Sequence, residues 1–223
     1  DILRQFEARK HAFPKKYIIS GAPRNDMLLI SNGKKNLEKI FGKQVKDSKI
    51  IWFTPTFRDY FGKKQGNKSF ENPFGFKDFN VAEFDNFLES QNSKVILKPH
   101  PQEENLIIQY FEDYPANNIL ILKSLDLDKL DIDFYEVLNS GDMLMTDYSS
   151  IFYDFLLLNK PILFIPIDFE EYKEDRGFLM ESYLDYVPGP IIFDQETLKD
   201  EIYRVLIKKE DNYKNNRDWM LKF

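Results

Sequence analysis

Five short apolar runs, spread along the chain, are the clearest pattern in this sequence. They lie at residues 49–54, 93–99, 117–122, 142–146 and 161–166, and each is bounded by polar residues or proline. Continuous runs rich in Ile, Leu, Val and Phe are typical of parallel strands buried on both faces. Stretches with helical spacing lie between or after them, at residues 81–90, 104–114, 133–140, 150–159 and 194–210. This alternation predicts an α/β fold, a parallel sheet with helices on both faces.

Three other parts of the pattern stand outside that alternation. Residues 55–79 form a long connection, and a loop of that length in a compact domain is usually functional or mobile. Residues 1–17 have helical spacing ahead of any strand, so we expect a helix or linker from a preceding domain, with residues 18–223 forming one domain. We expect no closing element in the last residues, around 219–223, and the chain resembles a piece of something longer.

Composition narrows the class of protein. The 223 residues are 43% apolar, with 21 Phe and 12 Tyr, which is enough for one packed core. The chain has no cysteine, so disulfides, thiolate metal sites and a cysteine nucleophile are excluded. No run approaches the roughly 20 apolar residues that a membrane-spanning helix needs. The net charge of -6 gives no overall attraction to nucleic acid, and we expect none as a partner.

Polar side chains follow several of the predicted strands. Arg58 comes shortly after the first strand, His100 after the second, residues 147–150 after the fourth, and Arg176 after the fifth. Because ligands of open α/β sheets bind beyond the carboxyl ends of the strands, we expect these groups to face one crevice. Two arginines, a histidine and a hydroxyl-rich turn suit a phosphate.

The turn at residues 146–150, Thr-Asp-Tyr-Ser-Ser, precedes a predicted helix. A helix beginning near Ser149 leaves its first N–H groups unpaired, and the hydroxyls of Ser149 and Ser150 extend that anion site. The alternative is that Asp147 or Ser149 only caps the helix.

The other candidates have alternatives too. His100 stands between two prolines, which restrict its direction, and it either donates to a phosphate or is a loop histidine bonded to a backbone carbonyl. Arg58 and Arg176 either bind phosphate or pair with the neighbouring Asp59 and Asp175.

Five blocks, in this order, resemble the CDP-glycerol glycerophosphotransferase family, which includes teichoic acid primases and polymerases. They are SGAPRND, TPTFRD, LKPHP, MTDYSSIFYDFLLLNKPILF and DFEEYKEDRGF, the last followed by PGPII, within residues 18–192. The resemblance implies a Rossmann-like, donor-binding domain similar to the C-terminal domain of a GT-B glycosyltransferase.

The implied reaction is transfer of glycerol phosphate, or ribitol phosphate, from a CDP-alditol to a lipid-linked or saccharide acceptor in teichoic acid or capsule-type polymer synthesis. The resemblance implies donor contacts for Arg24, Thr56, Arg58, His100, Asp147, Ser149, Ser150 and Arg176, with His100 and Arg176 as the catalytic pair. We expect no metal and no cofactor.

The family's His-Gly motif, assigned to the acceptor base in its other half, is absent here. We therefore expect the isolated chain to bind donor without turning it over, with a missing N-terminal acceptor domain as a partner. The implied location is cytoplasmic and peripheral, at the inner face of the cell membrane, through basic patches such as residues 203–223 on an anionic surface. The alternatives are a CMP-sugar transferase of the sialyl or Kdo type and a non-catalytic nucleotide-binding domain.

Overall fold

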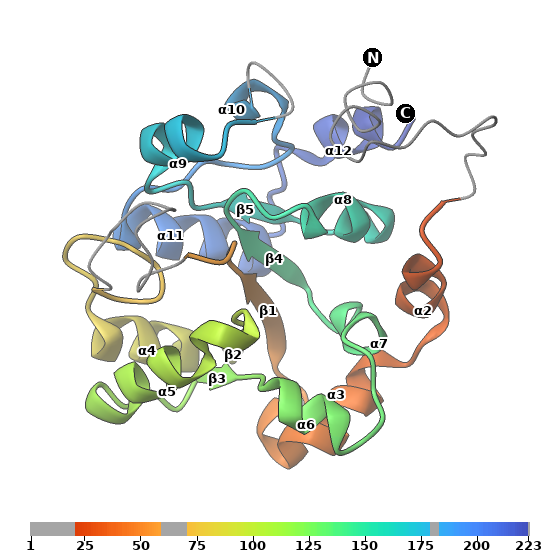
Figure 1. The fold of residues 1–223 in the computed structure, drawn as a ribbon, viewed down its shortest axis with the longest axis vertical. Helices are drawn as coiled ribbons and strands as arrows, with labels where there is room; N and C mark the ends of the chain where they lie inside the picture. Colours follow the sequence, from red (N-terminus) through yellow and green to blue (C-terminus); the bar gives the residue numbers. More distant parts are fainter. Residues whose placement is uncertain (1–20, 59–70, 179–182, 223) are drawn as a thin grey trace.

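The computed structural model of the chain describes residues 21–58, 71–178 and 183–222. Five parallel strands form one sheet in the order β3-β2-β1-β4-β5 (Figure 1). They are β1 (Lys49–Thr54), β2 (Ser93–Leu97), β3 (Ile119–Ile121), β4 (Met143–Thr146) and β5 (Ile162–Phe164). All five predicted strands are therefore confirmed, with ends that differ by a few residues.

Helices cover both faces of the sheet because the strand side chains alternate between two apolar clusters. In β1, Trp52 belongs to one cluster and Phe53 to the other. Buried residues of α2 (Arg24–Ile30), α3 (Gly33–Phe41), α6 (Ser124–Asp128), α7 (Tyr135–Leu138), α8 (Ile151–Phe155) and α10 (Tyr183–Tyr186) complete the first cluster. Buried residues of α4 (Val81–Ser90), α5 (Glu104–Asp113) and α11 (Gln195–Ile202) complete the second. The predicted two-sided α/β architecture is confirmed.

Several helices differ from their predicted extents. Residues 81–90 coincide with α4, whereas residues 150–159 divide into α8 and a 3₁₀ turn, Leu156–Leu158. Residues 194–210 divide into α11 and a π-helical turn, Tyr203–Ile207, and Asp194 caps α11 as predicted by accepting from the N–H of Thr197. Among the helices not predicted is α9 (Phe169–Asp175), which has no fully buried residue to give it an apolar stripe.

No element was expected around residues 219–223, but the structure has a helix there, α12 (Lys214–Met220). This helix is attached through Arg217, which is buried and donates from Nε to the side-chain oxygen of Asn159 at 3.3 Å. Arg217 also forms an ion pair with Asp211, and Asp218 accepts from the amide of Asn159 at 2.7 Å. Polar anchoring of this kind leaves no hydrophobic pattern in the sequence.

The predicted N-terminal segment, residues 1–17, lies outside the described residues. Its boundary with residues 18–223 therefore stays a prediction.

Candidate functional site

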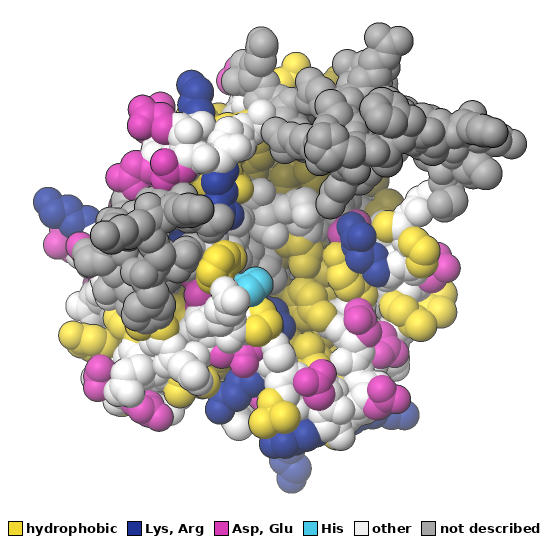
Figure 2. Space-filling view, in the orientation of Figure 1, with side chains coloured by type: hydrophobic (Ala, Val, Ile, Leu, Met, Phe, Trp, Pro, Cys, Tyr) yellow, Lys and Arg dark blue, Asp and Glu magenta, His cyan; other side chains and the backbone are white. Residues whose placement is uncertain are grey.

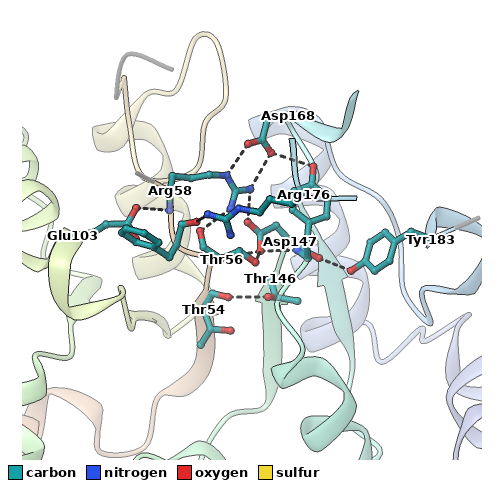
Figure 3. Close-up of polar contacts among 11 residues, drawn as sticks. Thr54, Thr56, Arg58, Glu103, Thr146, Asp147, Asp168, Arg176 and Tyr183 are labelled. Carbon is teal, nitrogen blue, oxygen red and sulfur yellow. Dashed lines mark hydrogen bonds and ion pairs between the residues drawn. The ribbon is translucent and has the colours of Figure 1, made fainter. Parts of the chain in front are cut away.

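The order of the strands reverses at β1, which lies between β2 and β4. Ligands of open α/β sheets bind beyond the carboxyl ends of the strands at such a reversal. Residues 55–58, 98–103 and 147–151 follow these three strands and gather there with residues 165–176, which follow β5 (Figure 3). The convergence of polar strand ends that the sequence predicts is present.

Arg58 is the central cation of this edge, and two carboxylates hold its guanidinium (Figure 3). Its Nε donates to Asp168 at 2.7 Å, and its Nη2 donates to Asp147 at 2.8 Å. The rings of Tyr148 and Tyr172 each lie 5.3 Å from its central carbon. Burial lowers the pKa of Arg58, but the two carboxylates outweigh that effect and raise it above its usual value. A phosphate would have to compete with both carboxylates for this guanidinium.

Asp147 holds the loop after β1 to the end of β4. Asp147 is buried, with 5% of its surface exposed. Its Oδ1 accepts from the N–H of Thr56 at 2.7 Å and from the hydroxyl of Thr56 at 2.6 Å. The N–H of Tyr148 donates to the same oxygen, while the hydroxyl of Tyr183 donates to the carbonyl of Asp147 at 2.8 Å. The carboxylate of Asp147 and the N–H and hydroxyl of Thr56 are therefore engaged within the protein. A direct phosphate contact by either residue stays a prediction.

The helix after this turn starts later than predicted. α8 begins at Ile151, two residues beyond Ser149, and no side chain caps it. The alternative of a cap by Asp147 or Ser149 is therefore wrong. Among the described residues, no side chain or backbone group is hydrogen-bonded to the hydroxyl of Ser149 or Ser150. Both hydroxyls are available to a ligand.

These two serines and His100 share one pocket, which we call the hydroxyl pocket. It is lined by Thr54, Pro55, Thr56, Phe57, Lys98, Pro99, His100, Pro101, Phe134, Tyr148, Ser149, Ser150, Ile151 and Tyr172. The Nδ1 of His100 accepts from the N–H of Gln102 at 3.3 Å, so the neutral ring carries its proton on Nε2. The partner of His100 is therefore an N–H group and not the backbone carbonyl of the alternative reading.

A second pocket adjoins the first, and we call it the acidic pocket. It encloses about 280 Å³ and is lined by residues 53, 55, 56, 58, 71–75, 77, 99, 103, 107, 147, 165, 167, 168, 171, 172, 175 and 176. On the face that holds both pockets, acidic side chains gather over α9 (Figure 2). Residues 55, 56, 99 and 172 line both pockets, so the two are contiguous.

Arg176 lies in the wall of the acidic pocket at the end of α9. Its Nη2 donates to the carbonyl of Phe57 at 3.0 Å, and its guanidinium lies 5.4 Å from the ring of Tyr172. Gly177 follows with φ +67°, a left-handed conformation that turns the chain so that Phe178 stacks on Phe169 at 5.2 Å. The structure therefore brings Arg176 beside the loop of Arg58 and next to the hydroxyl pocket.

Arg24 lies apart from the other predicted site residues. Its Nε donates to Asp154 of α8 at 3.0 Å, and its guanidinium lies 5.5 Å from the ring of Tyr135 of α7. The hydroxyl of Tyr135 donates to the same carboxylate at 2.7 Å. Arg24 lines neither pocket, so its donor contact stays a prediction.

Glu103 is a site residue that the sequence did not indicate. It is 7% exposed, and its Oε1 accepts from the N–H of Arg58 at 3.0 Å. Burial raises the pKa of Glu103 to about 7, against the lowering effect of its contacts with Arg58. Glu103 stands in the 3₁₀ turn Pro101–Glu103. The one signal in the sequence is that it follows His100 by three residues.

Tyr148 and Asp168 stand at strand ends, but no donor contact was predicted for them. The hydroxyl of Tyr148 donates to Asp168 at 3.1 Å, and burial together with Asp168 and Asp147 raises the pKa of Tyr148. Asp168 follows β5, so the strand-end argument places it at this edge. Within the described ranges, no group of three or more His, Cys, Asp or Glu is arranged to hold a metal ion.

Comparison with known proteins gives four consistent matches. The family model described as CDP-Glycerol:Poly(glycerophosphate) glycerophosphotransferase matches residues 1–223. The teichoic acid glycerol-phosphate primase of Bacillus subtilis (strain 168) is 32% identical over 183 residues, which are 82% of this chain and 41% of that protein. The teichoic acid poly(glycerol phosphate) polymerase of Bacillus spizizenii (strain ATCC 23059 / NRRL B-14472 / W23) is 31% identical over 209 residues, 89% of this chain and 47% of that protein.

A solved structure, that of the wall teichoic acid polymerase TagF, matches with a TM-score of 0.70 at 25% identity. The match covers 98% of this chain and 50% of that one. Together with the parallel sheet, it confirms the predicted fold class. This chain spans half or less of the length of each of these relatives.

Replacing Arg58 with Met should destabilise the protein by about 3–5 kcal/mol, because Asp147 and Asp168 would remain buried without their cation. The matched control is Arg24→Met. The side chain of Arg24 is 52% exposed in its ion pair, against 15% for Arg58, so its loss should cost about 1 kcal/mol or less. Urea unfolding of both variants gives the comparison, and equal losses would refute the role assigned to Arg58.

Glu103 should make stability fall as pH rises. Its folded pKa of about 7 exceeds the ordinary value of 4.5, so between these pH values the folded protein binds a proton that the unfolded protein does not. The contribution of Glu103 to the free energy of unfolding is fully present below pH 4.5. It is lost as pH rises through 7, which lowers that free energy by about 3 kcal/mol. Urea unfolding from pH 4 to pH 8 should show a smaller decline in Glu103→Gln. Parallel pH profiles for the two proteins would contradict the raised pKa.

Proposed function

This chain belongs to the CDP-glycerol:poly(glycerophosphate) glycerophosphotransferase family, and we propose that it binds a CDP-activated alditol for transfer of glycerol or ribitol phosphate. The observation that carries the proposal is the hydroxyl pocket. It combines the hydroxyls of Ser149 and Ser150, to which no described residue is bonded, with His100 and Lys98, and no Asp or Glu of the described residues lines it. Hydroxyl and nitrogen donors without a carboxylate suit a pyrophosphate.

In the proposed reaction an acceptor hydroxyl attacks the β-phosphorus of the donor. The new bond joins the acceptor oxygen to that phosphorus, the bond to the bridging oxygen breaks, and CMP leaves. His100, through Nε2, and Arg176, at the adjoining wall, stabilise the negative charge on the leaving phosphate. The proton of the acceptor passes to a base that we place outside these residues, with the acceptor-binding domain. The chain alone should then bind donor without acceptor-dependent release of CMP.

Calorimetric titration of the chain tests donor binding. CDP-glycerol or CDP-ribitol should bind more tightly than CMP-sialic acid or UDP-glucose, and the double variant Ser149→Ala/Ser150→Ala should weaken binding about ten-fold or more, because two hydrogen bonds to a charged phosphate are lost. The control is Ser90→Ala, which removes a hydroxyl from the exposed end of α4 and should leave binding unchanged. Tighter binding of CMP-sialic acid would favour the CMP-sugar reading. Binding of none of the four would refute the proposal.

We propose that the protein acts peripherally at an anionic membrane surface. No helix of the described residues is long and apolar enough to cross a membrane. In the basic region predicted for attachment, residues 203–223, three cations are held in ion pairs, Arg204 with Glu201, Lys214 with Asp218 and Arg217 with Asp211. Lys208 and Lys209 are exposed and have no ion pair among the described residues, so they are the charges proposed for the contact.

Co-sedimentation with vesicles tests this attachment. Binding should be stronger to anionic than to neutral lipid, should weaken at high salt, and should fall in Lys208→Glu/Lys209→Glu, because the attraction is electrostatic. Lys34→Glu/Lys35→Glu, on α3, is the matched charge control. Equal binding to neutral vesicles would contradict the proposal.

A further inference from the structure

The imidazole of His100 is oriented within its own turn by two contacts. Its Nδ1 accepts from the N–H of Gln102 at 3.3 Å, and its ring centroid lies 4.5 Å from that of Phe57. These contacts set the direction of the ring relative to the turn that carries it. The position of the turn itself depends on the two residues that join it to β2, Lys98 and Pro99.

Lys98 holds the start of this turn. Its side chain is 13% exposed, and among the described residues its ammonium donates to three oxygens. They are the carbonyl of Pro99 at 3.0 Å, the hydroxyl of Ser124 at 3.2 Å and Oε1 of Glu104 at 3.3 Å. An ammonium has three N–H groups, so these acceptors match its donors in number. Lys98 is therefore engaged within the protein, in part by the carbonyl of the residue before His100.

Glu104, the first residue of α5, is the second part of this arrangement. Its Oε1 also accepts from the N–H of Ser124 at 2.8 Å and from the hydroxyl of Ser124 at 2.6 Å. Burial raises the pKa of Glu104, but the bonds from Ser124 and the ammonium of Lys98 outweigh that effect and lower it. One ionised oxygen thus joins the beginnings of α5 and α6 to the ammonium that holds the carbonyl of Pro99.

We propose that Glu104 is a positioning residue for the donor site, acting on His100 through Lys98 and the carbonyl of Pro99. Glu104 is not among the described residues that line either pocket, so it has no contact of its own with a ligand there. The prolines on both sides of His100 restrict the backbone, so the place of Pro99 determines the place of the imidazole. This inference rests on the proposed donor binding and names a residue that supports it from outside the pocket.

The charge of Glu104 gives the inference a clear sign. A carboxylate repels a nearby phosphate, so electrostatics alone would make donor binding tighter when Glu104 is removed. Removal would also release the ammonium of Lys98 to a phosphate. A positioning role has the opposite effect, because His100 loses its place in the hydroxyl pocket and binding weakens.

Calorimetric titration with CDP-glycerol measures that sign. In Glu104→Ala we expect binding about five-fold weaker than in the wild type. Glu104→Gln keeps an oxygen that can accept from Ser124 and Lys98, and should stay within about two-fold of the wild type. The matched control is Glu112→Ala, which removes an exposed carboxylate from the same helix and should leave binding unchanged. Unchanged or tighter binding in Glu104→Ala would overturn the inference.

A double-mutant cycle with His100 separates positioning from general damage to the fold. We expect His100→Ala to weaken binding about ten-fold, and Glu104→Ala/His100→Ala to be no weaker than His100→Ala alone, since the residue that Glu104 positions is gone. Lys98→Met breaks the same set of contacts at its next member and should show the same lack of additivity with His100→Ala.

The outcomes of the cycle distinguish this inference from the proposed function. Losses that multiply in both double variants would overturn the inference and leave donor binding intact, as would an unchanged affinity in His100→Ala. A wild-type chain that does not bind CDP-glycerol or CDP-ribitol would refute the proposed function, and this inference with it.

Discussion

The ion pairs of Arg58 with Asp147 and Asp168 are the constraint on which the carboxyl edge of the sheet depends. Taking these charges out of water is costly, and only close mutual contacts offset that cost. The contacts connect the loop after β1 to the ends of β4 and β5, and the stacked rings of Tyr148 and Tyr172, 4.1 Å apart, pack against the same guanidinium. This cluster fixes the direction of α9, and so the position of Arg176.

The same cluster determines which polar groups are bonded within the protein and which are not. Arg58 neutralises carboxylates of its own protein, whereas no described residue is hydrogen-bonded to the hydroxyls of Ser149 and Ser150. It also stands between the two pockets, because Arg58 and Asp147 line only the acidic one while their neighbour Thr56 lines both.

Sequence patterns predicted the sheet well because strands buried on both faces leave continuous apolar runs, as in Ile50–Phe53. They missed α9 and α12 because neither helix has a fully buried apolar residue, so neither shows an apolar stripe. The gathering of polar residues beyond the carboxyl ends of the strands was predictable, because ligands of open α/β sheets bind at that edge. The pairing of Arg58 with Asp168 was not, since these residues are 110 positions apart and the neighbouring Asp59 and Asp175 looked equally suitable. Burial of Glu103 had no local signal, because a glutamate in a turn usually faces solvent.

The attachment of α12 through Arg217 and Asn159 has a consequence for the order in which the protein is completed during synthesis. Asn159 ends the 3₁₀ turn after α8 with φ +47°, and both polar atoms of its side chain are bonded to α12. These partners leave the ribosome about 58 residues later, and translation proceeds at roughly 5–20 residues per second. For those seconds the side chain of Asn159 lacks both of these partners. The turn beside the hydroxyl pocket therefore gains its polar contacts with α12 only late in synthesis.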